Sequence, residues 1–424
     1  MSYFLGSRLK SNVMAGVPTR TLREGDYEGS PIPPCGDFAS PSSSSIGTSP
    51  WLPQSTKGMS SPNSLHEEIV LFMKYMQPTP QEIDRRKDLV KRFTALIESF
   101  GLGATVQPVG SYVTGLYTPT SDIDMVLVSQ SKTRRSSFFH SSNLLSLDLY
   151  TILRKLRDSG FSSNIDNVLN ASIPLIRITD KITGIEIDLT ASDVHAVNAT
   201  DAVQKWMETD TKLIKMLVIV VKTFLSIRRL GKTYTGGVNS YLLVWMVVSW
   251  VKQEWPKNKV AAKARSNDEI DINSLTSGLV ALSMSSTAIL PHASAANEPP
   301  YPLVETLDYG TALIAFFKFY GLEFDYYQTA IKIHPSPRYQ NKIYPYSRYP
   351  ITQRYLLSIF DPADDSIDMG SKAYAIKHVK ASFKEAYETL KGRALRGGLS
   401  DSLGTALGGD FGNFERKRKK VAGN

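Results

Sequence analysis

The feature that most constrains this chain is a pair of aspartates at the start of an apolar run, DIDMVLV, residues 122–128. A run of this length and character predicts a buried strand, and alternate residues of a strand face the same way. Asp122 and Asp124 are therefore expected to point together toward one face. Two like charges at close range repel, and burial adds to the cost of ionising them. A fold that buries this strand must supply a compensating charge at that face.

A third acidic position occurs in IEIDLT, residues 185–190. Asp188 is flanked there by Ile187 and Leu189, which predicts a second buried strand that carries a carboxylate, whereas Glu186 lies nearer the strand start and is a weaker candidate. Three carboxylates on neighbouring strands, without histidine or thiolate, suit Mg²⁺ or Mn²⁺. The alternative interpretation is that such aspartates pair with lysine or arginine, or cap turns.

A Gly-Ser pair precedes the two aspartates, with ten residues between Ser111 and Asp122. Gly110 allows close backbone approach, and Ser111 offers a hydroxyl and an N–H to phosphate oxygens. Two divalent ions about 3.5–4 Å apart serve in-line phosphoryl transfer. The combination favours phosphoryl-transfer chemistry over a purely structural role for the aspartates.

Strand-like and helical segments alternate between residues 80 and 200, and long helical segments follow. The sequence therefore predicts an α/β or α+β unit of about 120 residues, followed by a mostly helical domain. The expected strands are 104–110, 123–128, 173–180 and 185–192, and the expected helices include 64–76, capped by Ser64, one that begins at Pro80, and 143–158.

Composition and charge limit the class of protein. The single cysteine, Cys35, excludes a disulfide framework and a cysteine-based zinc site, and it favours an intracellular protein. Net charge is +9, and residues 391–424 hold eight basic and three acidic side chains. This excess indicates a polyanionic partner, nucleic acid or an anionic membrane, with a merely solubilising tail as the alternative. The longest apolar run, 241–251, is far short of the ~20 residues that span a bilayer.

Three segments are expected to lack regular structure. Residues 1–60 are rich in Ser, Pro, Gly and Thr and are predicted to be disordered. Residues 391–424 are predicted to form a basic disordered tail, and 256–300 an extended loop insertion.

The Gly110-Ser111 pair, the spacer and the two aspartates together resemble the signature of the DNA polymerase β-like nucleotidyltransferases. The longer stretch GSYVTGLYTPTSDIDMVL is similar to one branch, the template-independent RNA nucleotidyltransferases of the TRAMP-complex poly(A) polymerase type. The resemblance implies that Asp122 and Asp124 bind both catalytic metals and that Asp188 is the third ligand.

The resemblance spans roughly residues 64–390. It implies an α+β fold of two lobes with the active site in the cleft between them. One lobe is a nucleotidyltransferase palm at 80–200, a small mixed sheet with helices on one face, and the other is a mostly helical central and PAP-associated domain at 61–79 and 201–390.

Nucleotide contacts are also implied. Lys222 lies in a mostly apolar helical segment, 211–230, and must reach water or an anion, the alternative being that it snorkels to the surface. The resembling family has a lysine at this place that contacts the triphosphate. The motif that follows is TGGVNSY, residues 235–241. In the family's version of this motif, a serine touches the triphosphate and a tyrosine stacks on the base. Ser240 and Tyr241 match these two, and Asn239 replaces a preceding serine.

The stretch LSIFDPADDSIDMG, residues 357–370, resembles the family's nucleotide-recognition loop. The resemblance implies nucleotide contacts for Asp361 and Asp364, and Asx-turn formation is expected alongside any such role. Relatives that prefer UTP often have a histidine where this chain has Ile367. The absence of that histidine favours ATP as the substrate.

The expected reaction is transfer of AMP from ATP to an RNA 3′ end with Mg²⁺ or Mn²⁺, in nuclear RNA processing, surveillance and decay. The resemblance implies a zinc-knuckle RNA-binding protein and an RNA helicase as partners, and the basic run FERKRKK suits both RNA phosphates and nuclear or nucleolar import. Three alternatives stay open: a terminal uridylyltransferase, a non-catalytic RNA-binding scaffold, and a nucleotidyltransferase acting on a small molecule.

Overall fold

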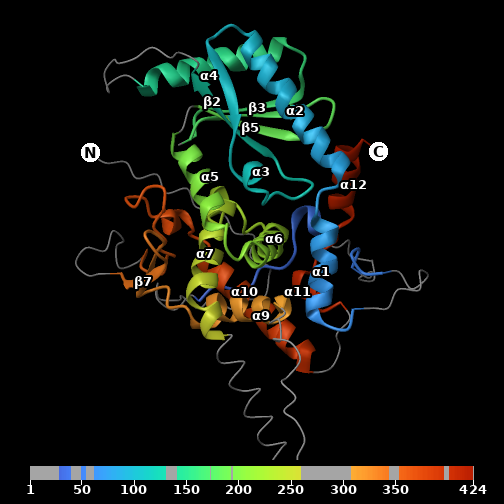
Figure 1. The fold of residues 1–424 in the computed structure, drawn as a ribbon, viewed down its shortest axis with the longest axis vertical. Coiled ribbons are helices and arrows are strands. Elements are labelled where there is room, and N and C mark those ends of the chain that lie inside the picture. Colours follow the sequence, from blue (N-terminus) through green and yellow to red (C-terminus); the bar gives the residue numbers. More distant parts are fainter. Residues whose placement is uncertain are drawn as a thin grey trace, which may run out of the picture.

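The computed structural model describes most of the chain outside its N-terminal segment and a few internal stretches (Figure 1). The described residues are 28–39, 49–53, 62–129, 141–171, 173–191, 194–258, 307–342, 353–395 and 401–423. The predicted loop insertion at 256–300 lies outside the described residues from 259 onward.

The palm is built on a five-stranded mixed sheet with the order β1-β2-β5-β4-β3. β2 (Ile123–Ser129) and β5 (Glu186–Thr190) are parallel neighbours at its centre, and every other pair of neighbours is antiparallel. The remaining strands are β1 (Ala104–Pro108), β3 (Ser162–Val168) and β4 (Leu175–Asp180). The predicted α+β class is thus confirmed.

Two helices, α2 (Pro80–Ser99) and α4 (Ser141–Asp158), pack on this sheet and share its hydrophobic core (Figure 1). A capping box at Thr79 and Glu82 starts α2, with Pro80 at the first position. The predicted starts of both N-terminal helices are confirmed, since Ser64 caps α1 (Leu65–Met76) in the same way by accepting from the Glu67 N–H.

β3 was not among the predicted strands. Its sequence, SSNIDNV, is polar because it is an edge strand whose side chains are mostly exposed. Its pairing with β4 therefore rests on backbone hydrogen bonds, which leave no apolar alternation in the sequence.

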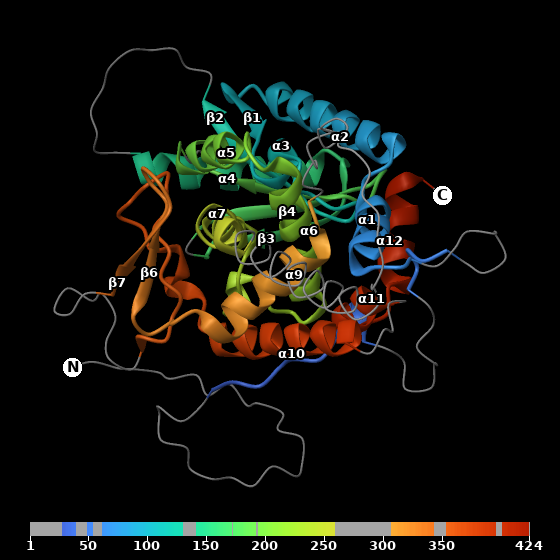
Figure 2. The same cartoon turned by 60° about the horizontal axis from the view of Figure 1, so that its bottom comes forward.

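The second, larger core belongs to the helical region, where α10 runs beneath α9 (Figure 2). Its helices are α5 (Val194–Trp206), α6 (Thr211–Ile227), α7 (Ser240–Gln253), α9 (Tyr309–Lys318) and α10 (Ile376–Leu395), with a π-helical turn at Phe319–Glu323 and 3₁₀ turns at Thr233–Thr235 and Met369–Lys372. Among the helices of the described residues, none is both long and apolar enough to cross a bilayer.

A short hairpin, β6 (Thr329–Lys332) and β7 (Arg338–Asn341), interrupts the helices and was not predicted. Ile331 of β6 bridges to Ile359, just before the segment that contains Asp361. The hairpin thereby fixes the start of the predicted nucleotide-recognition loop.

The prediction of a disordered tail over 391–424 is wrong for its described residues. Residues 391–395 belong to α10, and residues 401–423 contain α11 (Ser402–Leu407) and α12 (Gly412–Ala422). Phe414 and Val421, seven residues apart on one face of α12, enter the helical core and the palm core respectively. Two apolar residues among five basic ones make too narrow a stripe to be recognised in the sequence.

The side of α12 that carries Arg418 braces the junction between α1 and α2. The Arg418 guanidinium donates to the buried carboxylate of Glu82 at 2.7 Å and to the carbonyl of Gln77 at 2.9 Å. Part of the basic run is therefore used inside the molecule.

Predicted disorder over 1–60 is also wrong for the two described stretches, 28–39 and 49–53. Trp51 is 6% exposed and packs edge-on against Phe72 and Phe411. A single tryptophan in a Ser/Pro-rich segment gives no periodic signal, yet its large apolar area is enough to hold the segment in place.

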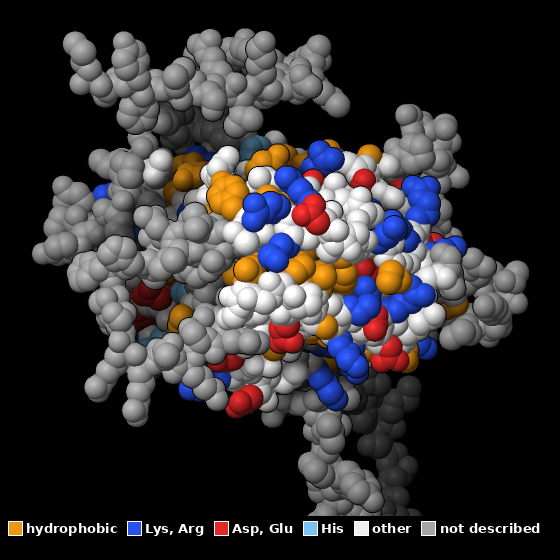
Figure 3. Space-filling view, turned by 90° about the horizontal axis from the view of Figure 1, so that it is seen from above, with side chains coloured by type: hydrophobic (Ala, Val, Ile, Leu, Met, Phe, Trp, Pro, Cys, Tyr) orange, Lys and Arg blue, Asp and Glu red, His pale blue; other side chains and the backbone are white. Residues whose placement is uncertain are grey.

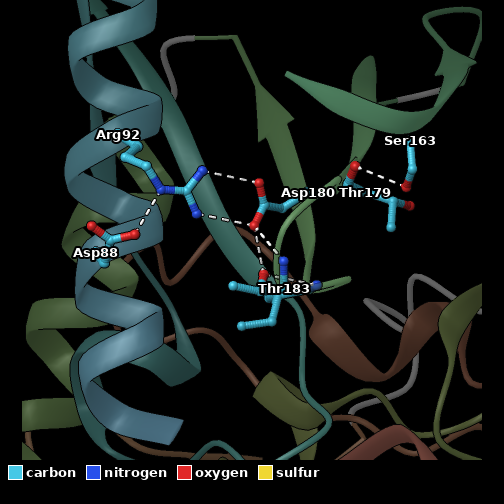
Figure 4. Close-up of polar contacts among 7 residues, drawn as sticks. Asp88, Arg92, Ser163, Thr179, Asp180 and Thr183 are labelled. Atoms are coloured by element: carbon cyan, nitrogen blue, oxygen red, sulfur yellow. Dashed lines mark hydrogen bonds and ion pairs between the residues drawn. The ribbon is translucent and has the colours of Figure 1, made fainter. Parts of the chain in front are cut away.

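A buried ion pair ties α2 to the sheet (Figure 4). Asp180, at the end of β4, is 0% exposed and accepts two hydrogen bonds from Arg92, at 3.0 and 3.1 Å. The N–H and hydroxyl of Thr183 donate to the same carboxylate. Burial by itself would raise the pKa of Asp180, and the hydrogen bonds from Arg92 and Thr183 hold it below its ordinary value.

Replacing Arg92 should destabilise the palm because Asp180 would keep a buried charge without its guanidinium. We expect Arg92→Met to lower the free energy of unfolding by about 3 kcal/mol in urea titrations at neutral pH. Lys91→Met, an exposed neighbour on α2, is the control and should change it by less than about 0.5 kcal/mol. The difference should begin to shrink as the pH falls through about 3.9, the ordinary aspartate pKa, because the unfolded chain then takes up a proton at Asp180. It should be lost only below the lowered pKa of folded Asp180, where the buried carboxyl itself becomes protonated. Equal effects of the two substitutions would contradict a stabilising role for the ion pair between Arg92 and Asp180.

Candidate functional site

A cavity of about 410 Å³ is lined on one side by the palm and on the other by α5, α6 and α7. Eight of the predicted site residues line it: Gly110, Ser111, Asp122, Asp124, Asp188, Lys222, Ser240 and Tyr241. Asn239, Asp361 and Asp364 are not among the lining residues.

The three carboxylates meet because β2 and β5 are parallel neighbours. Asp124 and Asp188 are register partners, and Asp122 lies just before β2. Burial, together with the charges of Asp122 and Asp188, raises the pKa of Asp124 to about 7. The repulsion expected from the sequence is therefore present in the folded chain.

The turn before the carboxylates requires a glycine. Gly110 has a φ of 66°, in the left-handed region, and an added Cβ would lie 2.9 Å from Asp124 Oδ2. Its N–H donates to the Thr200 hydroxyl at 2.9 Å. This close approach brings Ser111, the first residue of the short helix α3 (Ser111–Thr114), beside the carboxylates.

Arg86 of α2 positions the loop that leads into Asp122. Its fully buried guanidinium donates to the carbonyls of Pro119 and Ser121, at 2.7 and 2.8 Å, and lies over the Tyr117 ring. The spacer between the Gly-Ser pair and the aspartates is thus held by a side chain from a different element.

Arg177 of β4 engages the third carboxylate. Its Nε and Nη2 donate to the two oxygens of Asp188, at 2.8 and 2.6 Å. Within the described part of the chain, no three His, Cys, Asp or Glu side chains lie close enough together to hold a metal ion as they stand. The alternative interpretation, pairing with arginine, therefore holds for Asp188 in this arrangement.

The donor set nevertheless fits a divalent metal in its chemistry. Asp122, Asp124 and Asp188 offer only carboxylate oxygens around one cavity, the ligands that Mg²⁺ and Mn²⁺ prefer. The raised pKa of Asp124 marks a position where a cation would favour the ionised form.

A single lysine faces these carboxylates from α6. Lys222 is partly exposed toward the cavity, whereas Lys215 on the same helix is exposed. Burial lowers the pKa of Lys222, and the charges of Asp122 and Asp124 act in the opposite direction. Lys222 thus supplies a positive charge on the wall opposite the palm.

The start of α7 brings two further polar groups to the cavity. Asn239 caps the helix, since its Oδ1 accepts from the Leu242 N–H at 2.8 Å and its Nδ2 donates to the Thr233 hydroxyl. The capping role explains why Asn239 itself does not line the cavity. Ser240 and Tyr241, the next two residues, do.

Asp361 lies behind Tyr241. It is 1% exposed and accepts from the Tyr241 hydroxyl and from the Ala363 N–H, both at 2.8 Å. Asp364 is exposed and accepts from the Ser366 N–H at 2.9 Å. Both aspartates therefore form the Asx turns expected of a proline loop.

Sequence reasoning missed three residues at the site. Arg177 sits inside an apolar strand, and Arg86 falls on the buried stripe of α2, so in both cases a charge at a buried position was the available signal. His195, near the start of α5, lines the cavity and meets Asp361 at 2.8 Å. No pattern in the sequence connects these two residues.

Two family models match the chain. The model for the central palm domain of mitochondrial-like poly(A) RNA polymerases matches residues 65–208. The model for the PAP-associated region of Cid1 family poly A polymerases matches residues 308–367.

Curated relatives match over most of the chain. The poly(A) RNA polymerase cid14 of Schizosaccharomyces pombe is 26% identical over 341 residues, 80% of this chain and 42% of that protein. The inactive non-canonical poly(A) RNA polymerase protein Trf4-2 of Drosophila melanogaster is 28% identical over 347 residues, 80% of this chain and 72% of that protein. The chain spans about half the length, or less, of several curated polymerases that it matches.

The fold is shared with solved polymerase structures. The polymerase core of TRAMP, an RNA surveillance complex, superposes with a TM-score of 0.63 at 23% identity and covers 85% of this chain and 99% of its own. The Cid1 poly(U) polymerase with MgGTP bound superposes with a TM-score of 0.58 at 18% identity, covering 81% and 98%. Taken with the matching models, these findings show that the chain belongs to the Cid1/TRAMP-type poly(A) RNA polymerase family, with a nucleotidyltransferase fold and a PAP-associated domain.

Proposed function

We propose that this chain transfers AMP from ATP to the 3′-hydroxyl of an RNA, without a template, and releases pyrophosphate. The observation that carries the proposal is the cavity itself. Carboxylates of the palm line one wall, and Lys222, Ser240 and Tyr241 line the other. A nucleoside triphosphate has matching parts: phosphates that need cations and donors, and a base that needs an apolar face.

The chain's own groups divide this work. Ser111, Lys222 and Ser240 would hold the triphosphate, and the ring of Tyr241 would stack on the base, a contact that tolerates different bases. Asp122 and Asp124 would bind both divalent ions, with Asp188 joining at the attacking 3′-oxygen. Bound Mg²⁺ or Mn²⁺ would activate that oxygen and neutralise charge on the leaving pyrophosphate. Solved relatives with bound MgATP and MgGTP support this choice of metal.

Arg177 would position the third metal ligand, Asp188. Its bidentate contact fixes the orientation of Asp188. A ligand carboxylate that is already oriented loses less entropy when it binds a cation.

ATP is the proposed substrate, and a terminal uridylyltransferase is the second candidate. The poly(A) names of the curated relatives and Ile367 in the recognition loop favour ATP. The shared fold with the Cid1 poly(U) polymerase is the observation that favours UTP. A non-catalytic scaffold is a third candidate because one relative is named inactive, and the retention of all three carboxylates opposes it.

RNA is the proposed acceptor. The face of the palm seen in Figure 3 carries lysine and arginine side chains at many separate points, which suits contacts with a phosphate backbone. The exposed cations of α2 and α4 include Lys87, Lys91, Arg154 and Arg157. A role in RNA surveillance is proposed by analogy with the polymerase core of TRAMP. The nuclear location and the zinc-knuckle and helicase partners implied by the sequence resemblance are proposed with it.

Incubating the protein with an oligo(A) primer, Mg²⁺ and each NTP in turn tests the reaction and its base preference together. We expect extension with ATP to be faster than with UTP, CTP or GTP. Preference for UTP would assign the uridylyltransferase instead. If no NTP extends the primer, in Mg²⁺ or in Mn²⁺, the result would favour the non-catalytic scaffold.

Asp124→Asn removes one charge from the carboxylate cluster at nearly constant volume. We expect primer extension to fall by about three orders of magnitude because the ion ligated there stabilises transition-state charge. Asp158→Asn, an exposed aspartate at the end of α4, is the control and should extend at the wild-type rate. Circular dichroism checks that both variants are folded, and an active Asp124→Asn protein would refute the metal assignment.

Lys222→Met keeps the stem of the side chain and removes its charge. A hydrogen bond to a charged group contributes about 1.5–3 kcal/mol, so kcat/KM for ATP should fall about 10–100-fold in the primer assay. Lys215→Met changes an exposed lysine on the same helix and should have little effect. If both variants behave alike, Lys222 does not meet the triphosphate.

A further inference from the structure

A buried carboxylate joins three segments that lie far apart in the chain. Asp361 Oδ2 lies 2.8 Å from His195 Nε2, and its Oδ1 lies 2.8 Å from the Tyr241 hydroxyl and from the Ala363 nitrogen. His195 belongs to α5, directly after the palm, and Tyr241 to α7. Asp361 belongs to the segment matched by the PAP-associated model. The cluster therefore connects α5, α7 and the recognition loop on the wall of the cavity opposite the palm.

The direction of each hydrogen bond follows from the chemistry of the groups. An ionised carboxylate can only accept, so the Tyr241 hydroxyl and His195 Nε2–H both donate to Asp361. Burial, followed by the charge and hydrogen bond of Asp361, raises the pKa of Tyr241, so the hydroxyl keeps its proton. This arrangement assigns the proton of the His195 imidazole to Nε2.

The cluster fixes the ring that faces the cavity. Tyr241 is held at its hydroxyl by Asp361 and at its ring by Trp245, which packs edge-on with centroids 5.8 Å apart. Asp361 has a side-chain exposure of 1%, so it reaches the cavity only through its neighbours. Its hydrogen bond to His195 limits the directions in which its carboxylate can turn, and hence the orientation of Tyr241.

We propose that His195 is a positioning residue for nucleotide recognition: it orients Asp361 and, through it, the Tyr241 ring on which the incoming base stacks. The inference rests on the proposed function, because it assigns Tyr241 to the base. It adds that the base platform is assembled only when α5 and the recognition loop are held together. His195 therefore affects nucleotide binding more than the chemical step.

The test measures KM and kcat for ATP in the primer assay, and equilibrium binding of MgATP, for substitutions of His195. His195→Ala should raise KM and the dissociation constant for MgATP about tenfold, with kcat changed less than about twofold. His195→Gln, whose amide can still donate to Asp361, should recover most of the affinity. Asn198→Ala, an exposed residue on the same helix and outside the cavity lining, is the matched control and should match the wild type.

A double-mutant cycle separates positioning from general destabilisation. If His195 acts through Asp361 on the Tyr241 hydroxyl, His195→Ala should add little to the loss already caused by Tyr241→Phe. Fully additive losses, or an unchanged KM in His195→Ala, would overturn the proposal while leaving the transferase activity standing. A wild type that binds MgATP but extends no primer would instead overturn the proposed function, and weaker MgATP binding by His195→Ala would then still support the positioning role. A wild type that neither binds nor extends would overturn both.

Discussion

The repulsion among three carboxylates, gathered on the two central strands of the palm sheet and facing the cavity, is the constraint on which the rest of this structure depends. It explains why polar groups occur where the surrounding elements are apolar. Lys222 interrupts the apolar face of α6, and Arg177 interrupts β4, because each places a cation toward the carboxylates. It also explains the glycine at 110, since any larger residue would meet Asp124.

The cavity lies between the palm core and the helical core, so its shape depends on contacts that hold the two cores together. The C-terminal helix α12 provides such contacts. α12 inserts Phe414 into the helical core and Val421 into the palm core, while Arg418 braces the α1–α2 junction. Within the helical region, Asp361 joins α5 to α7 on the cavity wall opposite the palm. The relative placement of Lys222 and the aspartates therefore depends on residues that take no part in ligand binding.

Much of the fold could be predicted from local patterns. Ser64 and Thr79 mark helix starts through their own side chains, and the apolar strands of the palm interior are visible because they are buried. β3, α12 and Trp51 could not be predicted, for one shared reason. Each contributes only one or two apolar residues, or backbone hydrogen bonds alone, to a contact whose other half lies far away in the chain.

The sequence by itself determined which types of side chain the site contains. The i, i+2 spacing of Asp122 and Asp124 fixes them to one face of a strand, and the types of residue around them indicate a divalent metal and a phosphate-bearing ligand. Only the tertiary structure decided which groups meet. That Arg177 holds Asp188, that Asp361 stands behind Tyr241, and that His195 reaches Asp361 across 166 positions of the chain are results of packing. The physical reason is that local periodicity sets the face on which a side chain lies, whereas the angle and depth at which two elements pack decide what that face touches.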